Sequence, residues 1–327
     1  MAATIQGSAF VLTQCQVSVR PGWRDFLVRR AWIYIALVFC GGIWGLVPTL
    51  AQTAVEDGAH PFGLTWWQAF GGGGLVLLIT LARGKRLPLD RRHLGFYAFC
   101  GVAGTIVPTL ALFYSAGHVA AGIVAILMAA VAIAAYPLSL AARIDRIEPF
   151  RVLGLGLGLA GVAMLVLPGS DIEASDPVWV FIALLIPLGY AAENVFVAVK
   201  SPRQTEATTL VAGMLLAGGI LITPAMLATG TWYAITWPFS TAEWSVIAIF
   251  VINVASYALF LSLIYAAGPV FASMSGYFSV LTGILWGMVL LGERHDGWFW
   301  AALASMLAGM ALVKERKAER ATNAETV

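Results

Sequence analysis

The sequence predicts an all-α polytopic membrane protein that crosses the bilayer as ten helices, arranged as two inverted five-helix repeats. Three observations predict this fold: a very apolar composition, ten apolar stretches of membrane-spanning length, and basic residues gathered on one side. Of the 327 residues, 60% are hydrophobic and only 11% are charged, whereas a soluble domain has roughly 25% charged residues. Because so few charges cannot cover a protein of this size, we expect lipid to be the solvent for most of its surface.

The apolar stretches follow one another with short breaks. A transmembrane helix needs about 20 predominantly apolar residues. Cutting at charge clusters and at Gly or Pro breaks gives ten stretches, at residues 32–55, 62–82, 94–116, 120–142, 150–167, 178–199, 208–227, 244–266, 270–291 and 298–313. Strands of a transmembrane β-barrel would alternate apolar and polar residues. These stretches do not alternate, so we expect helices, with residues 1–31 and 314–327 as tails outside the membrane.

The basic residues predict the orientation, because cytoplasmic loops carry an excess of Lys and Arg. With the N-terminus inside and ten helices, 18 of the 19 basic residues lie on the cytoplasmic side, and only Arg294 lies outside. The opposite orientation would place those 18 outside, and a nine-helix count would move the basic C-terminal tail outside. We therefore expect both termini in the cytoplasm and the protein in the inner membrane.

A faint internal repeat divides the chain. Residues 145–166 resemble residues 293–313 at a constant offset of 148, since each segment begins with an acid-Arg pair and reaches a glycine, Gly161 or Gly309, sixteen residues on. Two halves of five helices, 32–168 and 169–313, must insert in opposite senses because five is odd. Inverted repeats are typical of secondary transporters, whose substrate site lies between the halves. Chance similarity between apolar segments is the alternative, and the sequence leaves it open.

Glycines in the fifth stretch match a nucleotide-binding pattern by spacing only. Residues 156–161 fit G-x-G-x-x-G, but that motif needs a preceding strand and a βαβ unit. Here it lies inside an apolar helix. Gly154 and Gly158 instead form G-x-x-x-G, which favours close packing of two membrane helices.

Glu193 is an acidic residue within a predicted span, seven residues before Lys200. An ionised carboxylate inside the bilayer costs on the order of 3 kcal/mol, so it should face a cavity, a partner or a proton. One interpretation is a titrating group that couples proton movement to transport. The other is a carboxylate that reaches the inner interface or pairs with a cation. Pro187 and Gly189 just before it should loosen the helix.

Polar and aromatic residues elsewhere in the spans are candidates for a binding site. Asn253 lies near the middle of its helix, four residues before Tyr257, so the two share a helical face. Gln68 lies in the second span. Buried amides bridge helices as well as contacting ligands, so both roles remain open. Tyr190, Tyr257 and Tyr277 are candidates for aromatic walls.

Two short motifs carry a family resemblance. Leu290-Leu-Gly-Glu293-Arg294 closes the ninth helix and precedes a tenth helix that ends in glycine, and Gly42-Ile-Trp44-Gly45 lies in the first helix. With these motifs, the chain resembles the drug/metabolite transporter (DMT) superfamily, in its EamA-like branch, over about residues 32–315. The resemblance implies ten helices in two inverted halves, and export or exchange of a small organic metabolite by alternating access.

The chain departs from that family's pattern at several positions. Gln52 and Gln68 stand where basic residues are common, Ala132 and Val280 replace prolines, and Asp145 replaces the first-half glutamate. These changes lie where the family's cavity is expected, so the resemblance does not identify the substrate.

The resulting hypothesis is a secondary transporter of a small organic metabolite. The candidate substrate-binding residues, expected to line a central cavity, are Trp44, Gln68, Tyr190, Asn194, Asn253, Tyr257 and Tyr277. Glu193 is the candidate proton-coupling residue, with protons as the candidate coupling ion. The expected partners are this small-molecule substrate and the lipid bilayer, with no nucleic acid, and the oligomeric state stays open.

Other classes of function fit the sequence less well. An intramembrane enzyme would need clustered nucleophiles, metal ligands or paired acids, and Glu193 is the one carboxylate in the middle of a span. We therefore expect no enzyme activity, no catalytic residues, no bound metal and no cofactor. A channel needs a selectivity filter or charged rings, and a receptor without transport would usually carry a soluble domain. These two remain the alternatives to a transporter.

Overall fold

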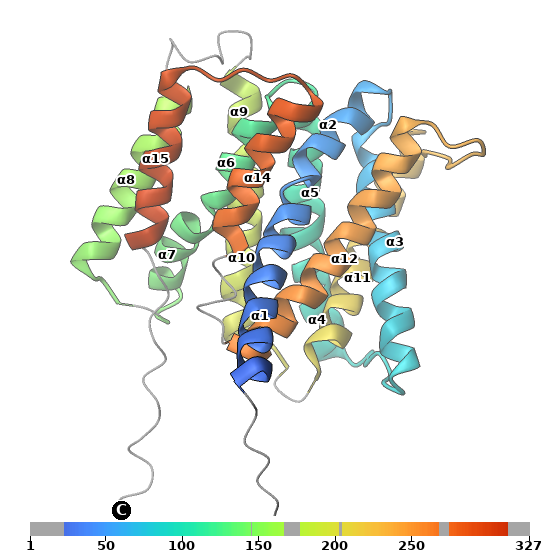
Figure 1. Cartoon of the computed structure of the whole chain (residues 1–327). Helices are drawn as coiled ribbons and strands as arrows, with labels where there is room; N and C mark the ends of the chain where they lie inside the picture. Colours follow the sequence, from blue (N-terminus) through green and yellow to red (C-terminus); the bar gives the residue numbers. More distant parts are fainter. Residues whose placement is uncertain (1–22, 145, 167–176, 203–204, 268–274, 313–327) are drawn as a thin grey trace, which may run out of the picture.

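The computed structural model describes residues 23–144, 146–166, 177–202, 205–267 and 275–312. Within these ranges every regular element is helical (Figure 1). Asp145, the acid that opens the first copy of the predicted repeat, lies outside the described residues, as do residues 1–22 of the predicted N-terminal tail and the whole predicted C-terminal tail, 314–327.

The helices follow the predicted apolar stretches closely. They are α1 (Trp23–Trp44), α2 (Val47–Glu56), α3 (Pro61–Ala82), α4 (Arg91–Cys100), the π-helix η1 (Gly101–Ile106), α5 (Val107–Ala116), α6 (Ala121–Ala129), α7 (Val131–Ala141), α8 (Pro149–Val166), α9 (Pro177–Ala183), α10 (Leu185–Lys200), α11 (Ala207–Ala228), α12 (Thr241–Ala267), α14 (Ser275–Leu290) and α15 (Gly297–Leu312).

Seven helical stretches among the described residues are long and apolar enough to cross a membrane. Three further apolar helices, within α8, α14 and α15, are shorter. Each of the ten predicted stretches therefore falls on helical structure, whereas ten complete crossings remain a prediction. Residues 270–274 of the predicted ninth stretch lie outside the described residues, and α14 covers Ser275–Leu290 of it.

Four predicted spans are interrupted rather than continuous. Proline lacks an N–H group, and its ring clashes with the carbonyl four residues earlier. Pro48 lies four residues after the end of α1 at Trp44, and Pro187 lies four residues after the end of α9 at Ala183. Pro108 likewise lies four residues after a position inside η1. The break at Ala130, between α6 and α7, has no such proline.

Two antiparallel helix pairs are held together by glycines. In the pair of α8 and α15, a methyl group on Gly161 would come within 2.9 Å of the Ala302 carbonyl oxygen and would also meet Met306. A methyl group on Gly309 would come within 2.6 Å of the Gly154 carbonyl oxygen and 2.7 Å of the Gly158 nitrogen. Between the two contacts, the Ser305 hydroxyl donates to the Leu157 carbonyl oxygen, 2.7 Å away. The predicted packing role of Gly154 and Gly158 is thus confirmed.

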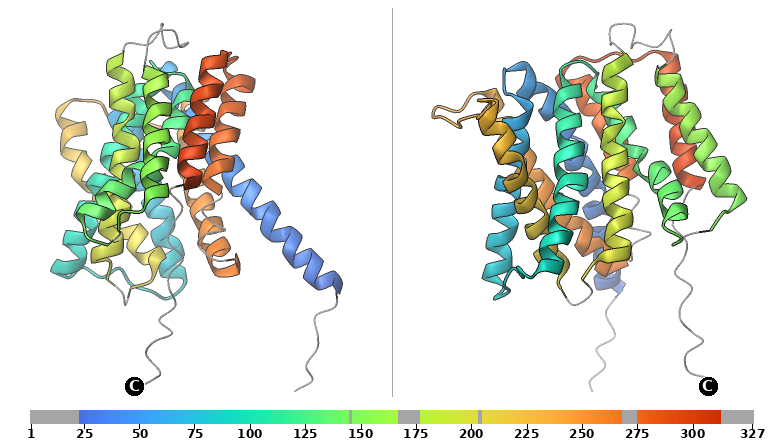
Figure 2. Two further views of the ribbon diagram at one scale, coloured as in Figure 1. Left: turned by 90° about the vertical axis from the view of Figure 1, so that its left-hand side faces the viewer. Right: turned by 180° about the vertical axis from the view of Figure 1, so that it is seen from behind.

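The pair of α3 and α11 is built in the same way. The two helices have 22 residues each. Gly73 faces Leu216 across the interface, where a methyl group would lie 3.1 Å from the leucine side chain, and Gly219 faces the ring of Phe70. Figures 1 and 2 show this pair and the pair of α8 and α15 at opposite edges of the bundle, with α1, α2, α5, α6, α10 and α14 between them.

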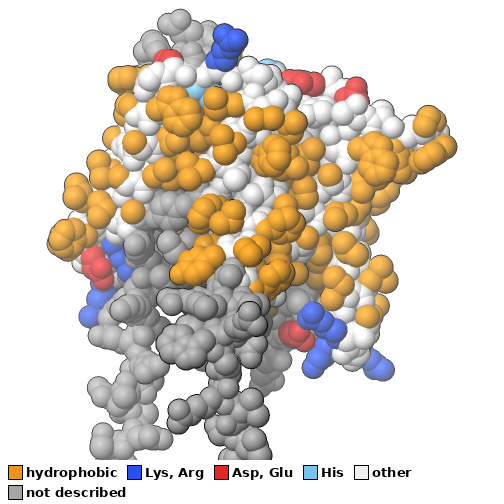
Figure 3. Space-filling model, in the orientation of Figure 1, with side chains coloured by type: hydrophobic (Ala, Val, Ile, Leu, Met, Phe, Trp, Pro, Cys, Tyr) orange, Lys and Arg blue, Asp and Glu red, His pale blue; other side chains and the backbone are white. Residues whose placement is uncertain are grey.

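The surface of the bundle is suited to lipid. Many large apolar side chains are exposed, such as Leu78, Phe150 and Val289, and they cover the side of the molecule between its two ends (Figure 3). Lys and Arg side chains gather at the lower edge of this view, with a further basic patch at the upper edge. The upper loop between α14 and α15 contains Arg294, the one exception in the predicted charge distribution. These features describe an integral membrane protein.

Candidate functional site

Two of the candidate site residues meet across the bundle. Trp44, the last residue of α1, donates its indole N–H to the side-chain oxygen of Asn253 in α12, over 3.1 Å. The ring of Phe260 meets Trp44 edge-on, with centroids 6.2 Å apart. Trp44 lies where α1 ends, four residues before Pro48. The contact joins residues 209 positions apart in the sequence.

Asn253 keeps unused hydrogen-bonding capacity. Its side-chain nitrogen is buried and has no hydrogen-bond partner among the described residues, although an amide carries two N–H donors. A buried donor without a partner costs free energy unless water or a ligand satisfies it. Tyr257 lies one turn further along α12, is half-buried, and shares the Asn253 face.

Gln68 lies on the neighbouring helix α3. One turn after it, Gly71 and Gly72 meet Phe250 and Val254 of α12, so Gln68 lies beside the helix that carries Asn253. Its side-chain oxygen is buried without a partner. This oxygen accepts hydrogen bonds, whereas the free group of Asn253 donates them.

Two buried threonines join this set, and the sequence analysis missed them. Thr49 in α2 and Thr65 in α3 are fully buried, and their hydroxyl oxygens have no partner among the described residues, as is also true of the Gln52 side-chain oxygen. Helical threonines commonly bond the carbonyl four residues earlier. Because threonine is common in apolar helices, the sequence does not single out Thr49 and Thr65. Only the structure shows that their hydroxyl groups lack this hydrogen bond. The unpaired groups on α2, α3 and α12 are all uncharged.

A second site surrounds Glu193 on α10. Its carboxylate lies directly against Gly104 of η1, in a space that any larger side chain at Gly104 would fill. Gly189, one turn earlier, allows equally close approach, since a methyl group there would lie 2.6 Å from the Ala103 carbonyl oxygen. No salt bridge to Glu193 is found among the described residues. π-Helical turns occur frequently at functional sites.

The other candidates lie at varied positions. Tyr190 is half-buried and lies one turn before Glu193. Asn194 is exposed on α10. Tyr277 belongs to α14, but its side chain lies outside the described residues. The structure therefore joins Trp44 to Asn253 directly and places Tyr190 one turn from Glu193, and no hydrogen bond links these two groups among the described residues.

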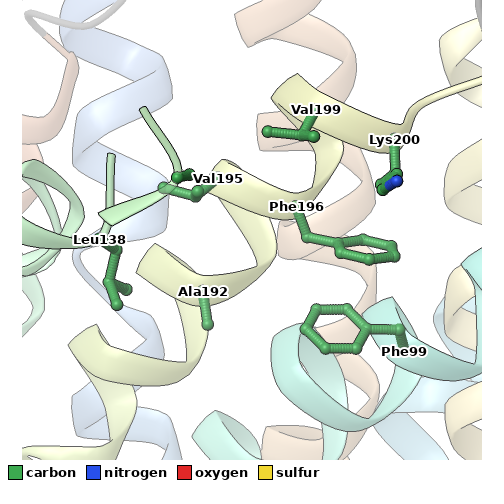
Figure 4. Close-up of a pocket in the computed structure, with 8 residues that line it drawn as sticks. Phe99, Leu138, Ala192, Val195, Phe196, Val199 and Lys200 are labelled. Carbon is green, nitrogen blue, oxygen red and sulfur yellow. The ribbon is translucent and has the colours of Figure 1, made fainter. Parts of the chain in front are cut away.

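A cavity of about 280 Å³ lies between α4, α7 and α10, and we call it the α10 groove (Figure 4). Its lining consists of Phe99, Leu138, Ala142, Ala192, Val195, Phe196, Val199 and Lys200. The rings of Phe99 and Phe196 stack with centroids 3.9 Å apart. None of the candidate site residues belongs to this lining, so the groove is a separate feature.

Glu293, from the motif that closes α14, has a clear structural role. Its carboxylate accepts hydrogen bonds from the backbone N–H groups of Ala121 and Gly122, at 2.5 Å and 3.0 Å. These groups begin α6, where a carboxylate caps the helix and complements its dipole. His295 lies 3.3 Å from the same carboxylate and stacks on Phe299. Glu293 thus ties the second half of the chain to the first.

Comparison with known proteins finds a family match over the first part of the chain. Residues 31–167 match the model of the EamA-like transporter family. Over these residues the chain matches the EamA-like branch of the DMT superfamily. The family resemblance inferred from short motifs is therefore confirmed, and the match covers the first predicted half. EamA-like proteins are membrane transporters, so this protein is a membrane transporter of the DMT type.

A solved structure supports the same fold at lower similarity. A crystal structure of a protein aligns with a TM-score of 0.57 and 18% sequence identity, over 86% of this chain and 94% of that chain. At this identity the likeness shows the fold alone. The comparison with curated proteins finds no match.

Proposed function

We propose that this EamA-like protein is a secondary transporter that exports or exchanges a small organic metabolite across the inner membrane by alternating access. In this mechanism two inverted five-helix halves rock about a substrate site between them, exposing it to each side in turn. The basic lower face would be cytoplasmic and would hold both termini.

The reciprocal glycine contacts carry this proposal. When two equivalent surfaces pack about a two-fold axis, each contact between residues i and j is repeated with the roles exchanged. Gly161 meets positions 302 and 306, and Gly309 meets positions 154 and 158, so an offset of 148 converts one contact into the other. Ser305 bonds Leu157 at the same separation. The pair of α3 and α11 shows the same relation with an offset of 146. Gly73 of α3 corresponds to Gly219 of α11, and its contact Leu216 corresponds to Phe70, the contact of Gly219.

This exchange supports an inverted repeat better than chance similarity does. The offset of 148 arose from sequence similarity alone, yet the same number relates the contacts in space. Both pairs are antiparallel helices from opposite halves, as an axis in the membrane plane requires. The pairs lie at opposite edges of the bundle (Figure 1), which leaves the region between them for a substrate site.

The proposed substrate site contains Trp44, Gln68, Asn253 and Tyr257, with Tyr190, Asn194 and Tyr277 as further candidate lining residues. Its unpaired polar atoms are amide and hydroxyl groups. Such groups suit an uncharged or zwitterionic polar metabolite, which can donate to Gln68 and accept from Asn253. Glu193 is the proposed proton-coupling residue, because a carboxylate between two helices can bind and release a proton as they move.

Transport into proteoliposomes tests the proposal. Neutral amino acids, nucleosides and sugars would first be screened by thermal shift, because a ligand of the folded state raises its stability. We expect a stabilising compound to show saturable uptake that accelerates when the same compound is present on the other side. Uptake that neither saturates nor exchanges would contradict a transporter and favour a channel, and binding without uptake would favour a receptor.

The Glu193→Gln variant tests the coupling role in the same vesicles. We expect it to retain exchange but to lose the dependence of net uptake on a pH gradient, because an amide cannot carry the proton. Glu206→Gln, at an exposed position before α11, is the matched control and should behave as the wild type. An unchanged pH profile in Glu193→Gln would remove Glu193 from the mechanism.

A further inference from the structure

The α10 groove is poorly suited to the transported metabolite. Sites for drug-sized ligands are typically about 300–1,000 Å³, and a few polar groups in them fix the ligand's orientation. The α10 groove measures about 280 Å³, and seven of its eight lining residues are apolar. The eighth is Lys200. A polar metabolite would lose hydrogen bonds to water here and regain few, whereas a hydrocarbon chain would lose none.

The groove opens to the side of the bundle, where lipid lies. At its rim, Phe99 is 42% exposed and Val199 is 46% exposed. Figure 4 shows the stacked rings of Phe99 and Phe196 on one side, with Val195 and Leu138 further along. Phe96 extends the aromatic stack, with its ring centroid 5.8 Å from that of Phe196. These side chains form an apolar wall whose rim residues are partly exposed on the side of the bundle that faces lipid.

Basic residues lie at one end of this wall. Lys200 is the last residue of α10, and Arg143 directly follows the lining residue Ala142, where the chain turns with a φ of 57°. Both are exposed, and no salt bridge to either is found among the described residues. Long basic side chains at helix ends reach the headgroup region. Basic pockets between transmembrane helices on the cytoplasmic side bind anionic headgroups.

We propose that the α10 groove binds one acyl chain of an anionic phospholipid, with Lys200 and Arg143 contacting its phosphate. The assignment of this lipid to the inner leaflet rests on the orientation given under the proposed function, and the rest of the proposal does not. The chain lies along Ala192, Val195 and Phe196, on the α10 face adjacent to Glu193. The bound lipid fills the space between α10, α4 and α7 and holds α10 in place against η1.

Native mass spectrometry of the purified full-length protein tests this site. Phosphatidylglycerol and phosphatidylethanolamine with identical acyl chains are added separately, and the lipid-bound fraction is measured. We expect tighter retention of phosphatidylglycerol by the wild type. Lys200→Gln should weaken phosphatidylglycerol binding roughly fivefold, the effect of one basic residue near an anionic lipid, and should leave phosphatidylethanolamine unchanged. Lys85→Gln, an exposed lysine on the loop before α4, is the control and should have no effect.

The apolar part of the groove is tested separately. Ala192→Phe fills the groove and should reduce retention of both lipids, whereas Ala304→Phe, at an exposed position of α15, should not. Equal retention of the two lipids by the wild type would overturn the proposal, as would equal loss in the Lys85 and Lys200 variants, because either result indicates ordinary lipid solvation. Binding is read without transport, so failure here would leave the proposed transport function untouched.

Discussion

The hydrogen bond between Trp44 and Asn253 shows how polar groups are placed at the scale of single residues. Burying either polar side chain without a hydrogen bond in an apolar bundle would cost free energy. The indole N–H of Trp44 donates to the amide oxygen of Asn253 and so reduces this cost. The amide nitrogen is left without a partner. The sequence predicted both residues as site candidates because each stands out in an apolar helix. It could not predict that they are in contact, because the periodicity of a single helix does not show which helices become its neighbours in the bundle.

Removal of the Trp44 N–H tests this pair. Trp44→Phe should destabilise the protein by about 0.6 kcal/mol, the average for hydrogen bonds between membrane helices, and should weaken the stabilisation given by the transported compound. Trp66→Phe is the matched control, since its N–H donates to Thr223 over 2.9 Å between α3 and α11. Thermal unfolding with and without the compound measures both effects. If the two variants lost ligand stabilisation equally, Trp44 would have only a structural role.

Glu293 has a structural role that the sequence did not reveal. Its motif was the strongest part of the family resemblance, yet the sequence offered no role for the side chain. The structure supplies one, as a cap on α6 that lies 171 and 172 residues earlier in the chain. Acidic caps are usually recognised by their position just before a helix. A cap donated from another part of the chain carries no such local signal.

At the scale of helices, the interruptions of the spans decide where functional groups lie. Each of the ten apolar stretches predicted from bilayer thickness falls on helical structure, and seven of them are long enough among the described residues to cross a membrane. The prediction treated most of them as continuous. The weakening expected before Glu193 from Pro187 is borne out by the break between α9 and α10. The same reasoning applied to Pro48 and Pro108 would have found the end of α1 and the irregular turn of η1.

The contact between η1 and α10 is tested by Gly104→Ala. The new methyl group would overlap the Glu193 carboxylate, so we expect a loss of about 1–3 kcal/mol in unfolding free energy, as for overpacked interiors. The double variant Gly104→Ala/Glu193→Ala should recover most of it, because removal of the carboxylate frees the space. Gly156→Ala, where a methyl group meets nothing within 4 Å, should be neutral or slightly stabilising. An equal loss in the single and double variants would show that the two residues do not share this space.

At the scale of the whole molecule, contacts between helices support the proposed inverted repeat better than sequence similarity does. The sequence similarity between the segments from 145 and from 293 is faint, and lipid-facing positions, which accept almost any apolar residue, would lose the trace of a repeat elsewhere. Glycines at close helix contacts are restricted by the facing backbone. In the proposed repeat, this restriction would preserve the exchanged contacts of Gly161 and Gly309 where sequence similarity is lost. The proposed substrate site could not be predicted from the sequence in the same way, since its residues meet through contacts between distant helices, as Trp44 and Asn253 do.

Thiol labelling of equivalent positions tests this symmetry directly. Arg146 and Arg294 are exposed and are separated by the repeat offset of 148, so inverted halves must present them on opposite sides of the membrane. In a background without Cys15, Cys40 and Cys100, a membrane-impermeant maleimide should label Arg294→Cys in intact cells. Arg146→Cys should react only after permeabilisation. Labelling of both positions in intact cells would mean that the halves insert in the same sense, and a site that alternates between two inverted halves could not then be built.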